Sequence, residues 1–274
     1  MQYYKIAIAA DSNQAEILTA LLSNIDFEMF DEGPALLNAY IPEPSFNLDQ
    51  LKEVLAAQAV NQFEITLMPD ENWNSIWESN FEPVIIANQV YIHAPFHQPI
   101  EGIKFPILIE PKMSFGTGHH STTSSIMELM LSNDFKDKIV TDMGCGSGIL
   151  AILAEQMGAK VVLAIDHDNW AFENTLENAL KNNCKKIIAK CGDAKLLLGT
   201  RADIFMANIN RNIILHDLDH YLTTINSNGI LLLSGFLEED FETIKQAVEL
   251  RNFTFENKLE HNGWLALQFK SLAS

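Results

Sequence analysis

Three groups of residues have the types and spacing needed to bind a ligand and act on it. The first is the glycine-rich run Thr141–Gly148, TDMGCGSG, the second is Asp166 in AIDHD, and the third is Asn208 in ANIN. Glycines permit a tight turn and let a ligand approach the backbone closely. A carboxylate such as Asp166 can accept both hydroxyl hydrogens of a ribose. The three groups together therefore predict a site for a ligand that carries a ribose.

Alternating strands and helices position these groups. The periodicity of apolar residues predicts a doubly wound α/β domain with a mostly parallel sheet. Ligands of such sheets bind at the carboxyl ends of the strands, where all three groups lie. A final hairpin turns at Asn262-Gly263 and adds an antiparallel strand. The expected strands are 138–142, 161–166, 186–191, 202–208, 230–234, 253–260 and 264–269, and the expected helices are 149–157, closed by Gly158, then 170–182, 212–225 and 238–251. Seven strands in this arrangement indicate a Rossmann-like seven-stranded methyltransferase domain.

The spacing of the glycines separates two kinds of ligand. Gly144, Gly146 and Gly148 form G-x-G-x-G after Asp142, whereas dinucleotide-binding dehydrogenases use G-x-G-x-x-G. G-x-G-x-G after an aspartate is typical of S-adenosylmethionine sites. A glycine turn without any ligand is the remaining alternative. The pattern favours a methyltransferase that uses S-adenosylmethionine.

Asn208 is the candidate for the chemical step. It is the last residue of its strand, and its side-chain amide can accept a hydrogen bond from an amino nucleophile and orient the lone pair. Methyl transfer to nitrogen needs proximity, alignment and a neutral amine more than a strong base. The alternative for Asn208 is an ordinary turn former at a strand end. The sequence Asn208-Ile209-Asn210 also lacks the Pro-Pro-aromatic run expected for methylation of nucleic-acid bases.

Two further residues have open alternatives. Asp193 follows the third strand of the large domain and can contact the adenine amine or cap a helix. His120 lies near the end of the loop 111–121, just before a helix that is expected to begin near Ser121 or Thr122. It is either a catalytic or substrate-gating residue or a structural part of this loop. Backbone N–H groups at this helix start can face a carboxylate such as that of the methionine moiety. No Cys or His partners at ligand spacing accompany His119 and His120, so no metal site is expected.

The first 68 residues form a separate unit. Their expected order is β-α-β-β-α-β, which is that of a ferredoxin-like α+β module. A short linker helix follows over 69–83, with Trp73 and Trp77 one turn apart, for packing or for substrate contact. The catalytic domain then occupies 84–274. The expected elements of the first unit are strands 3–9, 25–30, 35–41 and 63–68 and helices 12–23, with Ser12 as N-cap, and 48–60.

The charge of the chain limits its partners. The formal net charge is −18 over 274 residues, so nucleic acid would be repelled and a basic protein substrate attracted. The three cysteines have no paired spacing, which argues against a disulfide framework and structural zinc. The chain shows neither a secretory signal nor an apolar stretch of membrane-spanning length. We therefore expect a cytoplasmic protein that binds neither membrane nor nucleic acid directly.

In several motifs the sequence resembles the ribosomal protein L-eleven methyltransferase family, PrmA. Phe115-Gly116-Thr117-Gly118, followed by His120 and Thr122-Thr123, is similar to its FGTGTHPTT, and Asp142–Ile152 is similar to its D-x-GCGSGILAI. Ile165–Asp168 resembles its IDIDP, Ala207-Asn208-Ile209 its ANI, and Trp73 and Trp77 a tryptophan pair before the catalytic domain. The resemblance covers almost the whole chain, and the order and spacing of the motifs make it specific.

The resemblance implies a function and a set of residues. It implies a small N-terminal substrate-recognition domain, a mobile domain arrangement, and methylation of lysine side chains and the α-amine of ribosomal protein L-eleven. The resemblance also implies that Thr123, Gly144, Asp166 and Asn208 bind S-adenosylmethionine. Of these residues, Thr123 is indicated by the resemblance alone. Three residues depart from the family motifs without removing a binding residue, and these are His119 for threonine, Ser121 for proline and Asn169 for proline.

Overall fold

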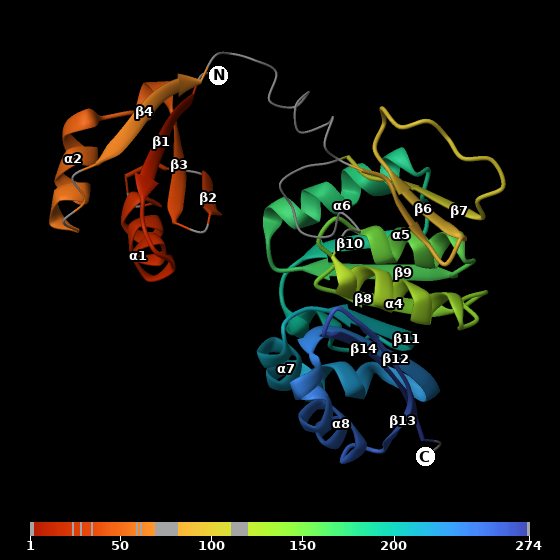
Figure 1. The fold of residues 1–274 in the computed structure, drawn as a ribbon. Coiled ribbons are helices and arrows are strands. Elements are labelled where there is room, and N and C mark those ends of the chain that lie inside the picture. Colours follow the sequence, from red (N-terminus) through yellow and green to blue (C-terminus); the bar gives the residue numbers. More distant parts are fainter. Residues whose placement is uncertain are drawn as a thin grey trace. The chain divides into compact units, whose positions relative to one another are not determined.

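The chain divides into two compact units, Met1–Ser79 and Asn80–Ser274. The computed structural model describes residues 3–23, 25–27, 29–33, 35–58, 60, 62–68, 82–110 and 120–272 (Figure 1). Most of the expected linker helix, including Trp73 and Trp77, therefore lies outside the described residues. The same holds for Phe115–His119 of the loop before the first helix of the large unit.

The N-terminal unit is one antiparallel four-stranded sheet with two helices. Its strands lie in the order β2-β3-β1-β4. Ile6 and Ile8 of the central strand β1 are fully buried against the helices, with Leu18 of α1 and Leu51 of α2 in the same core. The elements are β1 Tyr3–Ala9, α1 Ser12–Ser23, β2 Met29–Gly33, β3 Leu36–Pro42, η1 Glu43–Ser45, α2 Leu48–Ala57 and β4 Phe63–Met68.

Three expectations for this unit were wrong in detail. Residues 25–27 do not form a strand, because Asp26 has a φ of 65° and the N–H groups of Ile25 and Phe27 both donate to the carbonyl of Leu22. The segment therefore closes α1, and β2 begins four residues later. Asp11, not Ser12, caps α1, since its carboxylate accepts the Gln14 N–H at 2.9 Å. Helix α2 ends at Ala57 instead of continuing to residue 60.

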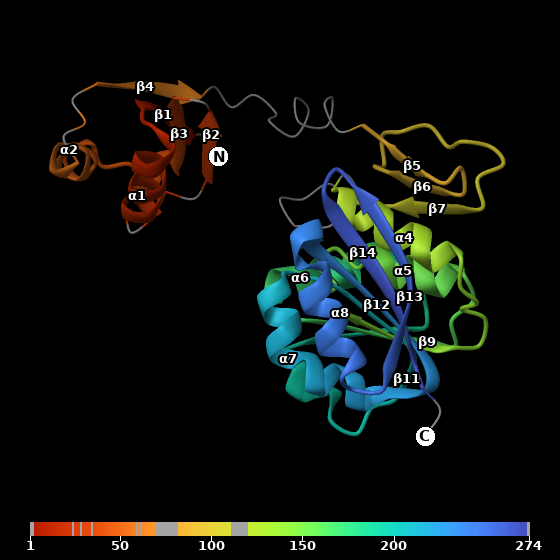
Figure 2. The same cartoon turned by 60° about the horizontal axis from the view of Figure 1, so that its bottom comes forward.

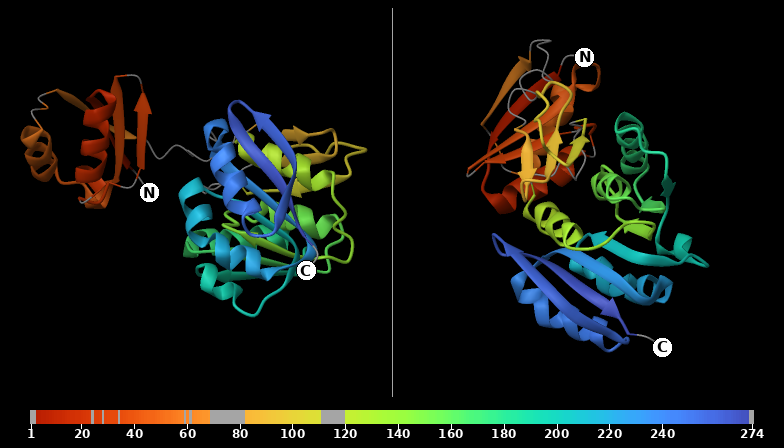
Figure 3. Two further views of the ribbon diagram at one scale, coloured as in Figure 1. Left: turned by 90° about the horizontal axis from the view of Figure 1, so that it is seen from below. Right: turned by 90° about the vertical axis from the view of Figure 1, so that its right-hand side faces the viewer.

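The second unit is built around a seven-stranded mixed sheet in the order β10-β9-β8-β11-β12-β14-β13. The first five strands are parallel, and the hairpin β13–β14 is joined to β12 through an antiparallel pairing (Figure 3). The strands are β8 Ile139–Met143, β9 Val161–Asp166, β10 Ile187–Cys191, β11 Ala202–Asn208, β12 Ile225–Leu237, β13 Phe253–His261 and β14 Trp264–Ser271.

Helices cover both faces of this sheet (Figure 1). Alternate residues of β11 separate the two cores: Ile204 and Met206 pack on the side of α4 and α5, whereas Phe205 and Ala207 pack on the side of α7 and α8. The helices are α4 Ser121–Leu131, α5 Ile149–Gln156, α6 Asn169–Lys181, η2 Ala194–Leu197, α7 Arg211–Thr224, η3 Glu238–Asp240 and α8 Phe241–Glu249.

The structure differs from the sequence-based prediction in the length of one strand and in the type and length of one helix. Strand β12 runs from Ile225 to Leu237, well beyond the expected 230–234, and has a bulge between Ser234 and Phe236 at Gly235, whose φ is 99°. The expected helix 238–251 is a 3-10 turn followed by the shorter helix α8. Gly158, with a φ of 102°, closes α5 as expected.

A separate three-stranded sheet, β5-β6-β7, precedes the large sheet in the chain (Figure 2). Its last strand is fixed to α6 by Asn182, which accepts the Leu108 N–H at 2.8 Å and donates to the Leu108 carbonyl at 2.6 Å. The side-chain amide thus takes the place of a neighbouring strand. The strands are β5 Val84–Ile86, β6 Val90–His93 and β7 Phe105–Leu108. Among the described residues, no helix is both long and apolar enough to span a bilayer.

Candidate active site

The glycine-rich segment forms a tight loop between β8 and α5. Gly144, Gly146 and Gly148 have φ values of 74°, 55° and 78°, which residues with a side chain rarely adopt. A Cβ atom on Gly144 would also lie 2.2 Å from Cγ2 of Ile209, the residue that follows β11. The loop therefore packs directly against the end of β11, and glycine is required at this point.

Asp166 fixes the loop from the end of the neighbouring strand β9. Its Oδ2 atom accepts the Gly146 N–H at 2.9 Å, and the Gly144 and Cys145 N–H groups donate to the carbonyl of Ile165. The Asp166 Oδ1 atom accepts the Asp168 N–H at 3.1 Å. Each carboxylate oxygen has two lone pairs, so both oxygens can still accept a hydroxyl hydrogen. The side chain is 10% exposed, so only a small part of it is open to a ligand.

Asn178 of α6 connects the glycine loop to the segment that leads into residues 111–119. The side chain is fully buried, its Nδ2 donates to the Ser147 carbonyl at 2.9 Å, and its Oδ1 accepts the Glu110 N–H at 3.2 Å. Asn178 was not among the residues predicted from the sequence. The feature that could have indicated it is the spacing of Asn174, Asn178 and Asn182 by four residues, which places them on one face of the helix.

Asn208 and Thr123 meet at the end of β11. Asn208 Nδ2 donates to Thr123 Oγ1, with 3.4 Å between the atoms, and Thr123 is buried in the first turn of α4. Among the described residues, the buried Oδ1 atom of Asn208 has no hydrogen-bond partner. An amide oxygen in this condition is an acceptor available to a ligand. The structure thus brings Asn208 together with the residue that the resemblance added.

His120 has a structural task at the start of α4. Its Nδ1 atom accepts the Thr122 N–H at 3.3 Å and lies 2.8 Å from Thr122 Oγ1, and its ring packs edge-to-face on Trp264 with centroids 4.7 Å apart. The Thr123 and Ser124 N–H groups donate to the His120 carbonyl. These three N–H groups are therefore occupied, contrary to the expectation that they face a ligand carboxylate.

Asp193 follows β10 and caps the turn η2. Its carboxylate accepts the Lys195 N–H at 2.9 Å and lies 3.3 Å from Lys195 Nζ. The hydrogen bond from the Lys195 backbone, with the Lys195 charge, lowers the pKa of Asp193 below its usual range. The side chain is 58% exposed, and its helix-capping role accounts for these contacts.

Asp142 lies beneath the glycine loop and is fully buried. Burial raises its pKa from 3.8 to about 7, the Ala151 N–H at the start of α5 opposes the rise, and the charge of Asp166 adds to it. Within the part of the chain that the structure describes, neither carboxylate oxygen closes a hydrogen bond, so the Ala151 N–H acts on the carboxylate from beyond bonding distance. With its pKa near 7, Asp142 carries only part of a negative charge at neutral pH, and the Asp166 carboxylate is the group that favours a cationic ligand there.

Comparison with known proteins defines the family. A family model described as ribosomal protein L11 methyltransferase (PrmA) matches residues 4–271. The chain belongs to this family. A protein named ribosomal protein L11 methyltransferase from Phocaeicola vulgatus is 41% identical over 260 residues, which cover 93% of this chain and 92% of that protein. A protein of the same name from Porphyromonas gingivalis is 40% identical over 260 residues, which cover 93% of this chain and 90% of that protein.

A solved structure agrees with the family membership. The ribosomal protein L11 methylase from Lactobacillus delbrueckii subsp. bulgaricus has a TM-score of 0.66 and 27% identity, and it covers 70% of this chain and 100% of that chain. Members of the PrmA family are thus similar to this chain both in sequence and in the fold of the catalytic unit. The large unit has an α/β methyltransferase fold with a mixed central sheet.

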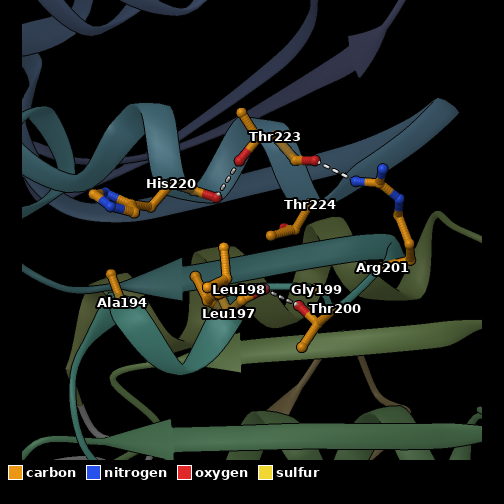
Figure 4. Close-up of a pocket in the computed structure, with 9 residues that line it drawn as sticks. All are labelled: Ala194, Leu197, Leu198, Gly199, Thr200, Arg201, His220, Thr223 and Thr224. Atoms are coloured by element: carbon orange, nitrogen blue, oxygen red, sulfur yellow. Dashed lines mark hydrogen bonds between the residues drawn. The ribbon is translucent and has the colours of Figure 1, made fainter.

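One cavity of the described residues lies away from the predicted site. It measures about 340 Å³ and lies between η2 and α7, with Leu198, Arg201 and His220 in its lining (Figure 4). None of the residues predicted to bind or act on a ligand lines it.

We predict that Asn178→Leu weakens binding of the expected donor, S-adenosylmethionine, because the Ser147 carbonyl and the Glu110 N–H lose their partner. Each unpaired buried group costs about 1–3 kcal/mol of unfolding free energy. Asn182→Leu is the matched control. It removes the hydrogen bonds of Asn182 to the Leu108 N–H and carbonyl, and these are not bonds to the glycine loop. Calorimetry should detect weaker donor binding only in the Asn178 variant, and equal affinities would contradict the coupling.

A second prediction concerns pH. The pKa of Asp142 is about 7 in the folded chain and near 3.8 in the unfolded chain, so the folded chain holds one more proton between these values. The free energy of unfolding should then fall as the pH rises from about 4 to about 7, on the order of a few kcal/mol from this group. Asp142→Asn should flatten this fall in urea titrations at pH 5 and pH 8. Parallel pH profiles for the two proteins would refute the assignment.

Proposed function

We propose that this chain transfers methyl groups from S-adenosylmethionine to lysine side chains and to the N-terminal amine of ribosomal protein L11. The observation that carries the proposal is the buried amide oxygen of Asn208, which has no hydrogen-bond partner among the described residues and lies next to the loop fixed by Asp166. Family membership over residues 4–271 supports both the chemistry and the substrate. The names of the relatives state methyl transfer to this ribosomal protein.

The residues present fit the methyl donor. Each oxygen of Asp166 accepts one backbone N–H and keeps a lone pair for a ribose hydroxyl, with His167 Nδ1 3.4 Å from Oδ1, and Gly146 places no side chain over the loop. The Asp166 carboxylate supplies negative charge near a sulfonium. When bound, S-adenosylmethionine supplies a methyl group on a positively charged sulfur, which is released as a neutral thioether when an amine lone pair takes the methyl.

Asn208 orients the acceptor in this scheme. Its Oδ1 atom accepts an N–H of the amine, so the lone pair is directed away from the amide and toward the donor half of the site. The amine must be neutral, and its proton passes to solvent before transfer. Thr123 holds the Asn208 amide in place through the 3.4 Å contact with Nδ2. We assign His120 a positioning role at α4, since its Nδ1 atom already accepts the Thr122 N–H.

The N-terminal unit is the proposed recognition domain for the protein substrate. Its strand order β2-β3-β1-β4 and its β-α-β-β-α-β succession support a ferredoxin-like domain over residues 1–68. The net charge of −18 supports attraction of a basic protein. Residues 69–83 would link this domain to the Rossmann-like, seven-stranded catalytic domain of 84–274.

Replacing Asp166 with alanine should lower the affinity for S-adenosylmethionine by about ten- to a hundred-fold, because a charged hydrogen-bonding group worth about 1.5–3 kcal/mol is lost. The glycine loop also loses the acceptor of the Gly146 N–H. Asp219→Ala is the control, since Asp219 is an exposed carboxylate that pairs with Arg251 on the surface. Calorimetry that found the Asp166 variant binding as tightly as the wild type would reject the assignment.

Mass spectrometry tests the function directly. Purified ribosomal protein L11 incubated with this chain and S-adenosylmethionine should gain mass in steps of one methyl group, at lysines or the N-terminal amine. Asn208→Ala should lose most of this activity, because the amine loses the acceptor that orients its lone pair. An unmodified L11, in the presence of proven donor binding, would contradict the proposed substrate and redirect the search to other basic proteins or small amines.

A further inference from the structure

A second cavity lies at the carboxyl ends of β11 and β12, and its lining begins two residues after Asn208. It measures about 260 Å³, and its lining includes Asn210 and Arg211 after β11 and Gly235 and Phe236 near the end of β12. A Cβ atom on Gly235 would lie 2.3 Å from the Ile209 carbonyl oxygen, so the segment after Asn208 forms one wall of this region. The glycine loop and Asp166 lie on the neighbouring strands β8 and β9.

This arrangement divides the carboxyl edge of the sheet into two halves. The half over β8 and β9 has the features of the donor site, and the half over β11 and β12 contains the cavity. Asn208 lies at the boundary, because β11 pairs with β8 on one side and β12 on the other. Asn208 itself does not line the cavity, but Asn210 and Arg211, which follow it in the chain, do.

Trp264, the first residue of β14, forms an aromatic wall of the cavity. Its ring is fixed edge-to-face on His120 at an interplanar angle of 72°. The turn before it is tied to α4 by the Asn262 amide, which donates to Ser121 Oγ at 3.0 Å. A fixed indole can pack along an aliphatic stem and attract a cation at its face.

The lining of the cavity contains one more carboxylate than basic side chains. Arg211 pairs with the largely buried Asp240, which also accepts the Leu237 N–H at 3.2 Å. Glu239 lines the same cavity and is exposed. One positive and two negative side chains give the lining a net charge of −1, which suits a cationic guest.

We propose that this cavity receives the side chain of the lysine to be methylated, with Trp264 along its methylene stem and Glu239 attracting the cationic side chain as it enters, before the amine loses its proton to solvent. The inference rests on the proposed function and specifies where the acceptor enters. The N-terminal amine of the substrate lacks a four-carbon stem, so its methylation depends less on Trp264 than lysine methylation does.

The test is the steady-state kinetics of L11 methylation at saturating S-adenosylmethionine, with lysine and α-amine products resolved by mass spectrometry. Trp264→Ala should lower kcat/KM for lysine by about ten-fold and for the α-amine by clearly less, and Trp264→Phe should restore part of the loss. Leu198→Ala, which enlarges the unrelated cavity of Figure 4, should leave both values unchanged.

Glu239→Gln provides a second variant, because an exposed side chain can be changed without loss of folding. It should raise KM for L11 several-fold and weaken the dependence of KM on salt. Glu238→Gln is its matched control, since the adjacent Glu238 is engaged with Lys258 at 3.4 Å and does not line the cavity.

The outcomes separate the two proposals. A wild-type chain that methylates neither amine of L11 overturns the proposed function. If the wild type is active, unchanged lysine kcat/KM in both Trp264→Ala and Glu239→Gln overturns the acceptor cavity. A loss of donor affinity in Trp264→Ala, measured by calorimetry, also overturns it, because Trp264 would then act through His120 and α4. Selective loss of lysine methylation with normal donor affinity supports it.

Discussion

The hydrogen bond from the Gly146 N–H to Asp166 is the interaction on which the site depends. It joins the loop after β8 to the end of β9, and β8 and β9 are themselves paired in the sheet. Behind the loop, Asn178 holds the Ser147 carbonyl, and Thr175 donates to the Gly146 carbonyl at 2.9 Å. The loop is therefore held in place before any ligand arrives, so binding requires little reordering of the backbone.

The close contact between the loops after β8 and β11 separates the proposed donor and acceptor positions. Gly144 and Ile209 approach so closely that no side chain fits between them, and Asn208 lies immediately before Ile209. A methyl donor over β8 and β9 and an amine over β11 and β12 would thus meet at one residue. Methyl transfer is an in-line displacement, so the amine lone pair must approach the methyl carbon from the side opposite the sulfur, and separate donor and acceptor positions along this sheet edge would permit that approach.

How much the sequence could predict depended on how local each interaction was. The glycine loop, Asp166 and Asn208 were placed at strand ends because apolar periodicity locates strands and because ligands bind at their carboxyl ends. Their roles in binding and catalysis stay predictions. Residues 25–27 were misread because burial of Phe27 and the φ of Asp26 follow from packing. Asn178 and Trp264 were missed, since Asn178 bonds Glu110 across 68 residues and Trp264 reaches His120 through the hairpin.

Hydrogen exchange of the backbone amides, with and without S-adenosylhomocysteine, tests the central claim that the donor binds at the carboxyl ends of β8 and β9. The account predicts slower exchange at residues 143–148 and 166–168, and no change around the cavity between η2 and α7. Protection confined to residues 194–201 and 220–224, with the glycine loop unaffected, would contradict it.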